Sequence, residues 1–342
     1  MEIGIYTFAD ITPDPHTGKA VSTEQRFAEI VAAARLADDV GLDMFGLGEH
    51  HRADIAIASP AVVMAAIATV TSRIRLTSAV TILSTLDPVR VFQDFATVDL
   101  LSGGRAEIIA GRGAFLESFP LFGYDLADYD ALFSEKLDLL LKLNASERVT
   151  WEGRFRTSLN DAEISPRPVQ EELPVWLGVG GNPESALRAG VLGLPMILAN
   201  ISKPPATFAD QFGAYRKAGV DVGHDSARLT SGVATHLHVH EDAGTARDGF
   251  YPYYSAYFSH HAPKTSYLAA VPREEYDRRI APAGPVFVGS PQQIVDKIGY
   301  EKELFGHQRF LAQVDIGGLP YSEVARVIEL LGNKVLPAVR RL

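Results

Sequence analysis

Short apolar runs alternate with longer amphipathic runs along this chain, and that alternation constrains its fold more than any other feature. Strands that alternate with helices favour a parallel sheet covered by helices, which is an α/β architecture. Eight such alternations favour a closed (β/α)8 TIM barrel over an open sheet. The strands that we expect are residues 2–8, 44–48, 75–81, 106–110, 175–179, 195–200, 229–239 and 310–316.

Helix-start signals follow several of these runs. Ser22-Thr23-Glu24-Gln25 has the spacing of a capping box, and Ser59-Pro60 and Asp87-Pro88 place a capping side chain before a proline. These patterns are typical of the first turn of a helix. The helices that we expect are residues 22–40, 60–71, 88–100, 129–143, 205–218, 291–305 and 321–331, with another beginning at Pro183.

The segment between the last two expected strands is much longer than a crossover requires. It holds an aromatic run at residues 250–261, a proline-rich and charged stretch at 263–285, and the helix 291–305. Connections of this length are usually functional. We therefore expect one TIM-barrel domain over residues 1–342, with residues 240–290 forming an insertion, or lid, on the barrel rim.

Composition excludes several classes of protein. A formal net charge of −10 disfavours a nucleic-acid partner or an anionic membrane surface, because both would attract a basic face. The chain has no cysteine, so disulfides, thiolate nucleophiles and cysteine metal sites are absent. The start of the chain runs directly into a strand pattern without the basic leader of a secreted protein, and we expect a cytoplasmic location.

Gly48-Glu49-His50-His51 closes the second apolar run, where a barrel strand would end. Active sites of such barrels are built at the carboxyl ends of the strands, so these side chains are candidate catalytic or binding groups. Neighbouring side chains of a strand point to opposite faces, and only one of the two histidines is expected to enter the pocket. We expect no metal site, because the alternation from His236 to His240 is better explained as one face of a strand.

Two further segments could bind an anion. Arg112 lies between Gly111 and Gly113 directly after the fourth expected strand. Residues 178–185, Gly-Val-Gly-Gly-Asn-Pro-Glu-Ser, lead from a strand into a helix, and a helix N-terminus with a glycine-rich approach can bind phosphate. A tight turn without a ligand explains the same pattern. The segment has neither a dinucleotide-binding nor a Walker spacing, so it does not specify a nucleotide.

Taken together, these segments resemble the bacterial luciferase-like flavin monooxygenases. The resemblance extends over most of the chain and weakens between residues 240 and 290, and it is the ordered set of motifs that makes it specific. The motifs are Gly48–His51, residues 78–83 followed by Asp87-Pro88-Val89-Arg90, Ser102-Gly103-Gly104-Arg105, Gly111-Arg112-Gly113 and residues 193–198.

The resemblance implies a TIM barrel that uses reduced FMN and molecular oxygen to oxygenate a small organic substrate such as an aldehyde. The reduced flavin would come from a separate NAD(P)H:flavin reductase. The resemblance also implies a homodimer, formed through outer helices that are rich in alanine and valine, such as residues 60–71 and 88–100.

The resemblance also implies which residues of this chain would bind the phosphate of FMN. Arg112 resembles the arginine that holds the phosphate in this family. Gly181, Asn182 and Ser185 resemble the backbone and hydroxyl groups that bind the phosphate after the fifth barrel strand.

The resemblance implies that three further residues lie at the flavin ring. Ala79-Val80 matches a non-proline cis peptide behind the ring, and His50 matches the catalytic histidine. Two alternatives stand beside the FMN monooxygenase: a deazaflavin-dependent oxidoreductase that transfers hydride, and a non-catalytic flavin-binding barrel.

Overall fold

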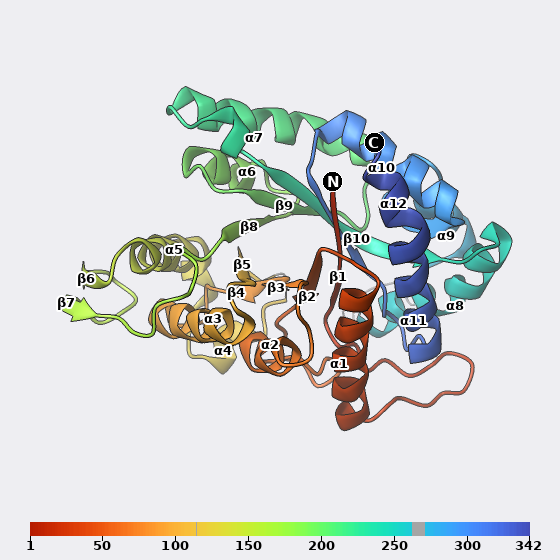
Figure 1. The fold of residues 1–342 in the computed structure, drawn as a ribbon, viewed down its shortest axis with the longest axis horizontal. Helices are drawn as coiled ribbons and strands as arrows, with labels where there is room; N and C mark the ends of the chain where they lie inside the picture. The colour runs from red at the N-terminus through yellow and green to blue at the C-terminus, as the bar shows by residue number, and fades with distance from the viewer. Residues whose placement is uncertain (114, 262–270) are drawn as a thin grey trace.

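A closed barrel of parallel strands forms the centre of the computed structural model, which describes residues 1–113, 115–261 and 271–342 (Figure 1). Within these residues the strands pair in the order β1, β2, β3, β5, β8, β9, β10 and β12, and β12 pairs again with β1. The predicted (β/α)8 TIM barrel is therefore confirmed. The barrel strands are β1 (Glu2–Thr7), β2 (Met44–Leu47), β3 (Arg75–Ser78), β5 (Ala106–Gly111), β8 (Val175–Val179), β9 (Met196–Ala199), β10 (Ser231–Val239) and β12 (Arg309–Gln313).

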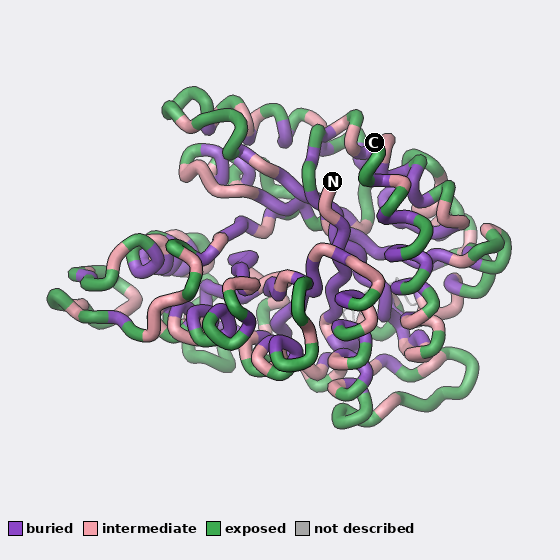
Figure 2. The backbone as a smooth tube through the Cα atoms, in the orientation of Figure 1, coloured by how far each residue is buried: buried purple, intermediate pink, exposed green. Residues whose placement is uncertain are grey.

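Helices surround the barrel, and Figure 2 shows the strands buried at the centre with exposed positions on the outer surfaces of the helices. The longer helices are α1 (Thr23–Asp39), α2 (Pro60–Ala68), α3 (Pro88–Ser102), α5 (Tyr129–Ala145), α6 (Pro183–Val191), α7 (Ala209–Asp221), α8 (Ala243–His261), α9 (Arg273–Ile280), α10 (Pro291–Phe305) and α11 (Tyr321–Leu330). Short helical segments are α4 (Ser118–Leu121), η1 (Leu126–Asp128), η2 (Pro205–Phe208), η3 (Ser226–Arg228), η4 (Leu331–Val335) and α12 (Leu336–Val339).

Side-chain caps explain where several helices begin. The Ser22 hydroxyl accepts a hydrogen bond from the Gln25 amide at 3.1 Å, and the Asp87 carboxylate accepts from the amides of Val89 and Arg90. Each cap satisfies an N–H group that has no partner inside its helix. Ser59, which the sequence also indicated as a cap, makes no such bond, so that helix begins on Pro60 alone.

Three short strands, β6, β7 and β11, lie where the sequence indicated only irregular chain, and a fourth, β4, begins at the end of the expected strand 75–81. Strands β6 (Arg148–Trp151) and β7 (Leu159–Glu163) form an antiparallel hairpin that projects at the left of Figure 1. β4 (Thr81–Ile82) continues beside β5, and β11 (Phe287–Gly289) pairs with β10 outside the barrel. All are shorter than six residues, too short for a periodic pattern to identify.

The insertion between β10 and β12 is more regular than expected. The aromatic run belongs to the long helix α8, and the stretch 263–285, expected as a loop, contains helix α9. Tyr276 of α9 is fully buried in an aromatic cluster with Phe250 and Tyr254 of α8, and this burial stabilises a helix that its polar sequence does not predict. The lid prediction falls partly on residues 262–270, which lie outside the described residues.

In the part of the chain that the structure describes, no helix combines the length and apolar character needed to cross a membrane.

An ion-pair network closes the end of the barrel at which the strands begin. The Arg309 guanidinium, 2% exposed, donates to both carboxylate oxygens of Glu107 at 2.6 and 3.2 Å and to Glu2 at 3.0 Å. It also lies 3.9 Å from the ring centroid of Trp176. Arg75 pairs with Glu2. These contacts connect β12 to β1, β3, β5 and β8 across the barrel interior.

Removing the buried carboxylate should destabilise the fold. We expect Glu107→Ala to lower the free energy of unfolding by about 3 kcal/mol, because it leaves the Arg309 charge buried with only Glu2 beside it. Chemical denaturation measures the change. Glu323→Ala is the control, because its partner Arg326 is 50% exposed and such pairs contribute less than about 1 kcal/mol. Equal losses in the two variants would contradict a structural role for the network.

Candidate active site

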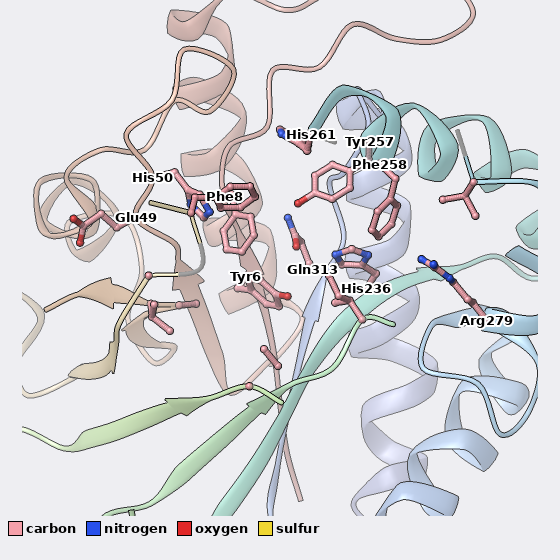
Figure 3. Close-up of a pocket in the computed structure, with 18 of the residues that line it drawn as sticks. Tyr6, Phe8, Glu49, His50, His236, Tyr257, Phe258, His261, Arg279 and Gln313 are labelled. Atoms are coloured by element: carbon pink, nitrogen blue, oxygen red, sulfur yellow. The ribbon is translucent and has the colours of Figure 1, made fainter. Parts of the chain in front are cut away.

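A cavity of about 600 Å³ opens where the barrel strands end (Figure 3). Its floor and near wall come from residues at or just beyond the carboxyl ends of the strands, where barrel enzymes carry their active sites. Its far wall comes from α8 and α9 of the insertion. The barrel contributes Tyr6, Phe8, Glu49, His50, Ala79, Val80, Ile82, Gly113, Phe115, Gly180, Ala199, Ile201, His236 and Gln313, and the insertion contributes Tyr257, Phe258, His261, Val271, Pro272, Glu275 and Arg279.

His50 lines this cavity, and His51 does not. The His50 ring lies 4.3 Å from the Phe8 ring and 5.2 Å from the Phe115 ring, centroid to centroid, and its Nδ1 has no hydrogen-bond partner. His51 turns away and contacts Glu49 through Nε2 at 2.8 Å. The prediction that one histidine of the pair enters the pocket is confirmed.

Glu49 has a structural role beside His50. One carboxylate oxygen contacts His51, and the other accepts from the Ile82 amide at 2.9 Å. Its own amide donates to the Val80 carbonyl at 3.1 Å. Glu49 therefore holds the end of β2 against the β3–β4 connection and leaves its carboxylate engaged with protein groups.

The Ala79–Val80 peptide, which the resemblance implied to be cis, is cis in the structure and lines the cavity. Two glycines make room for the Val80 side chain. A Cβ on Gly111 would lie 2.4 Å from Val80 Cγ2, and a Cβ on Gly178 would lie 3.0 Å from Val80 Cγ1. The glycines of β5 and β8 therefore allow Val80 to pack against the barrel while its peptide faces the cavity.

Burial keeps the His50 imidazole uncharged. Loss of solvation, followed by the positive charges of His261, Arg52 and His51, lowers the pKa of His50 to about 4. At neutral pH the ring is therefore a neutral imidazole, which has one donor and one acceptor nitrogen. Such a group can accept a proton from a reacting molecule beside it.

The two segments proposed to bind an anion meet at one corner of the barrel rim. Arg112 Nη2 donates to the Ser185 hydroxyl at 2.8 Å, and Arg112 Nη1 contacts Asp130 at 2.6 Å. The Asn182 side chain caps α6 by accepting from the Glu184 amide at 3.0 Å, so Asn182 is a capping residue here. A Cβ on Gly181 would meet no atom within 4 Å, so the approach to the α6 N-terminus is open.

Gly180 connects this anion corner, defined as Arg112, Gly181, Asn182 and Ser185, to the cavity that it lines. The structure thus brings together three predicted groups of residues: His50, the Ala79–Val80 peptide and the anion corner. His50, Ala79 and Val80 line the cavity, and the anion corner adjoins it beyond Gly113 and Gly180.

Sequence reasoning missed a second set of cavity residues. Tyr6, Gln313 and His236 lie in register on the neighbouring strands β1, β12 and β10. Gln313 is a polar residue in a buried apolar strand, and that signal could have identified it. His236 was interpreted as part of a strand face, which is correct, but that face is the inside of the barrel.

Arg279 of α9 lines the far wall. Its Nε donates to Glu275 at 2.8 Å and its Nη1 donates to the Tyr254 hydroxyl at 3.2 Å. His261, at the end of α8, contacts Asp10 at 3.2 Å and thereby joins the insertion to the loop after β1. The far wall is therefore attached to the barrel by ionisable groups.

The described residues contain no group of three or more histidine and carboxylate side chains placed to hold a metal ion. His238 of β10 stacks on Phe250 with ring centroids 4.7 Å apart.

Comparison with known proteins supports the resemblance seen in the sequence. A family model described as luciferase-like monooxygenase matches residues 1–308. Among solved structures, the monooxygenase RslO1 from Streptomyces bottropensis is 25% identical, with a TM-score of 0.85 and coverage of 98% of this chain and 99% of that one.

Two further solved structures share the fold at lower identity. One is the oxygenating constituent of 3,6-diketocamphane monooxygenase from Pseudomonas putida in complex with FMN, at 19% identity, TM-score 0.79 and 98% coverage of both chains. The other is an F420-dependent secondary alcohol dehydrogenase, at 18% identity, TM-score 0.77 and 99% coverage of both chains. The same fold therefore occurs with two different cofactors.

The ionisation of His50 can be measured directly. We expect its NMR resonances, assigned by comparison with His50→Gln, to stay constant from pH 8 to about 5 and to shift only nearer pH 4. A midpoint near 6.5 would contradict the burial argument.

Between pH 6.5 and 4 the unfolded chain binds a proton at residue 50 that the folded chain does not. Relative to His50→Gln, the free energy of unfolding should therefore fall by about 1.4 kcal/mol per pH unit as the pH falls.

Proposed function

Since the chain belongs to the luciferase-like monooxygenase family, we propose that it is a flavin-dependent monooxygenase that uses reduced FMN and molecular oxygen to oxygenate a small organic substrate. One observation carries this proposal: an uncharged histidine and a cis peptide line an apolar cavity that the anion corner on the rim adjoins.

The anion corner suits the phosphate of FMN. Arg112 would supply a charge-assisted pair, Ser185 a hydroxyl donor, and the open α6 N-terminus beyond Gly181 and Asn182 its unpaired amides. The contact between Arg112 and Ser185 already holds both side chains at one place. Asp130, exposed at 71% of its side chain, is positioned to keep Arg112 oriented.

The apolar part of the cavity suits the ring system of the flavin. Ala79, Val80, Gly113 and Gly180 line the side of the cavity that leads to the anion corner. When bound, reduced FMN supplies the electrons that activate oxygen. Phe8 and Phe115 enclose His50, so this end of the cavity excludes water from the reacting groups.

His50 is the residue to which we assign proton transfer. Its Nδ1 is buried without a partner, and its low pKa keeps the ring neutral at neutral pH, so that one ring nitrogen is available as a proton acceptor. A positioned general base of this kind contributes typically about 10²–10⁴-fold to the rate.

Two alternatives remain beside FMN-dependent oxygenation. The fold is shared with an F420-dependent enzyme, so the fold alone does not select the cofactor. An oxidised deazaflavin absorbs at shorter wavelength than oxidised FMN, and the spectrum of the reconstituted protein separates the two. A non-catalytic flavin-binding barrel would bind FMN without consuming oxygen in an enzyme-dependent reaction.

We also propose two partners. A separate NAD(P)H:flavin reductase would supply the reduced cofactor. A second copy of the chain would pack on α2 and α3, where Val62, Leu100 and Leu101 are 69%, 46% and 55% exposed. Apolar residues exposed on the outer helices of the barrel would be covered in such an interface.

The experiment that tests the proposed function combines the protein with FMN, NADH, a flavin reductase and an aldehyde, the organic substrate that the resemblance implies, and measures oxygen uptake. Labelled oxygen, ¹⁸O2, then shows whether one oxygen atom enters an organic product. Oxygen uptake no faster than with the reductase and FMN alone, together with the absence of labelled product, would contradict a monooxygenase.

Arg112→Ala tests the phosphate assignment. We expect the Kd for FMN to rise by about one to two orders of magnitude, because the variant loses charge-assisted hydrogen bonds, while the Kd for riboflavin changes little. Fluorescence titration of both flavins measures the difference. Arg148→Ala, in the exposed β6–β7 hairpin, is the matched control and should leave both constants unchanged. Equal losses for FMN and riboflavin would place Arg112 outside the phosphate site.

His50→Ala tests the catalytic assignment. We expect turnover at saturating reduced FMN to fall by at least about 10²-fold, while the Kd for FMN changes by less than about tenfold. Stopped-flow kinetics with pre-reduced FMN measures both constants, and the exposed His16→Ala is the control. A variant that loses affinity but keeps its turnover at saturation would make His50 a binding residue.

A further inference from the structure

Three polar side chains form a row across the floor of the cavity, and we call Tyr6, Gln313 and His236 the polar tier. Tyr6 of β1 pairs in register with Gln313 of β12, and Gln313 pairs in register with His236 of β10. Neighbouring strands lie about 4.8 Å apart, so the three side chains enter the cavity at one level. Figure 3 shows them side by side, with Tyr257 above Gln313.

The central residue of the tier makes no hydrogen bond of good geometry inside the protein. Gln313 is 0% exposed, and neither its Nε2 nor its Oε1 has a hydrogen-bond partner. Tyr257 and His236 lie close to the amide without completing a hydrogen bond to it. His236 is 1% exposed, and its Nδ1 also lacks a partner. Buried polar groups in folded proteins are almost always paired, so unpaired groups that face a cavity point to a ligand.

The tier recognises an uncharged group. Burial and the nearby Arg279 charge lower the pKa of His236 to about 3, so its imidazole is neutral under ordinary conditions, as is the Gln313 amide. The charge of Arg279 is already paired with Glu275 at 2.8 Å. Among the described residues that line this side of the cavity, an anionic group would therefore find no free cation, and its desolvation would oppose binding.

Aromatic rings enclose the tier. The Tyr257 and Phe258 rings lie 5.5 and 5.8 Å from the His236 ring, and the Tyr6 ring lies 5.5 Å from the Phe8 ring, centroid to centroid. Figure 3 places His50 at one end of this group and Arg279 at the other. Flat apolar walls of this kind favour a planar ring over a flexible alkyl chain, because ring contacts are gained with little loss of conformational freedom.

We propose that the polar tier binds the polar edge of a neutral aromatic substrate that carries a hydrogen-bond donor and an acceptor side by side, as a lactam or a hydroxy-ketone does. The Gln313 amide presents its own donor and acceptor together and so matches such an edge with two hydrogen bonds. This inference rests on the proposed function and narrows its substrate class. A simple aldehyde, which has an acceptor only, would leave the Gln313 amide half-paired.

Binding of three matched probes to the FMN-loaded, oxidised protein tests the inference. The probes are 2-quinolinone, with an adjacent donor and acceptor, naphthalene, of similar size with neither, and 2-naphthoate, which is an anion. We expect isothermal titration to show that 2-quinolinone binds at least about tenfold more tightly than naphthalene and 2-naphthoate. Gln313→Met should reduce the preference for 2-quinolinone over naphthalene to less than about threefold. A preference that survives in Gln313→Met, or no preference in the unmodified protein, would overturn the proposal.

A second measurement separates the tier from the cofactor site. Gln313→Met should leave the Kd for FMN within about threefold. A large loss of FMN affinity with an unchanged probe preference would assign Gln313 to the flavin and overturn the proposal. If the protein bound no FMN, the proposed function would fail, but the same probes titrated against the cofactor-free protein would still test the tier.

A third measurement distinguishes a ligand site from a structural amide. Replacing an unpaired buried amide by an apolar side chain of similar size costs little, so Gln313→Met should keep or raise the Tm. Gln170→Met is the matched control, because its amide donates to Asp99 at 2.7 Å and to the Ala106 carbonyl at 2.9 Å. The control should lower the Tm by a few degrees and keep the probe preference. An equal loss of Tm in Gln313→Met would show that its amide is structural and overturn the proposal.

Discussion

The buried ion-pair network around Arg309 is the interaction on which the arrangement of the active site depends. It joins β12 to β5 across the barrel and, through Glu2 and Trp176, to β1 and β8. A strand that slipped by one residue would turn every inward side chain outward. Since Arg309 and Gln313 are four residues apart on β12, they point to the same face, and the network that holds Arg309 inside also directs Gln313 inside.

Charge is distributed unevenly over the two ends of the barrel. The end at which the strands begin holds buried ion pairs, whereas the cavity at the other end includes histidines that burial keeps neutral, His50 and His236. Arg112, which we assign to the phosphate, lies apart on the rim, where it pairs with the exposed Asp130 at 2.6 Å. In the proposed function this separation lets a charged cofactor tail remain near solvent, while its ring and a neutral substrate would share a space of low polarity, where hydrogen bonds and proton transfers are less screened.

Much of the barrel could be predicted because its signals are local. Caps such as Ser22 and Asp87 and the alternation of apolar runs depend only on neighbouring residues. The same holds for His50, which follows a strand directly. Helix α9 was missed because its sequence is polar throughout and only the long-range burial of Tyr276 stabilises it. The prediction that Arg112 and Ser185 lie at one site depended on the family resemblance, because 73 residues separate them along the chain.

The polar tier shows why the remaining part of the site could not be predicted from the sequence. Gln313 carries a visible signal, an amide in a buried strand, but its meaning depends on which residues stand beside it. Only the register of β12 with β1 and β10 places Tyr6 and His236 next to it, and those residues are 307 and 77 positions away along the chain. The aromatic rings above the tier come from α8, in the segment where the family resemblance is weakest. The near wall, which would face the proposed flavin, thus comes from short connections after the strands, while the far wall, which would face the proposed substrate, comes from the insertion. On this proposal, changes in the insertion would alter the substrate without disturbing the cofactor side.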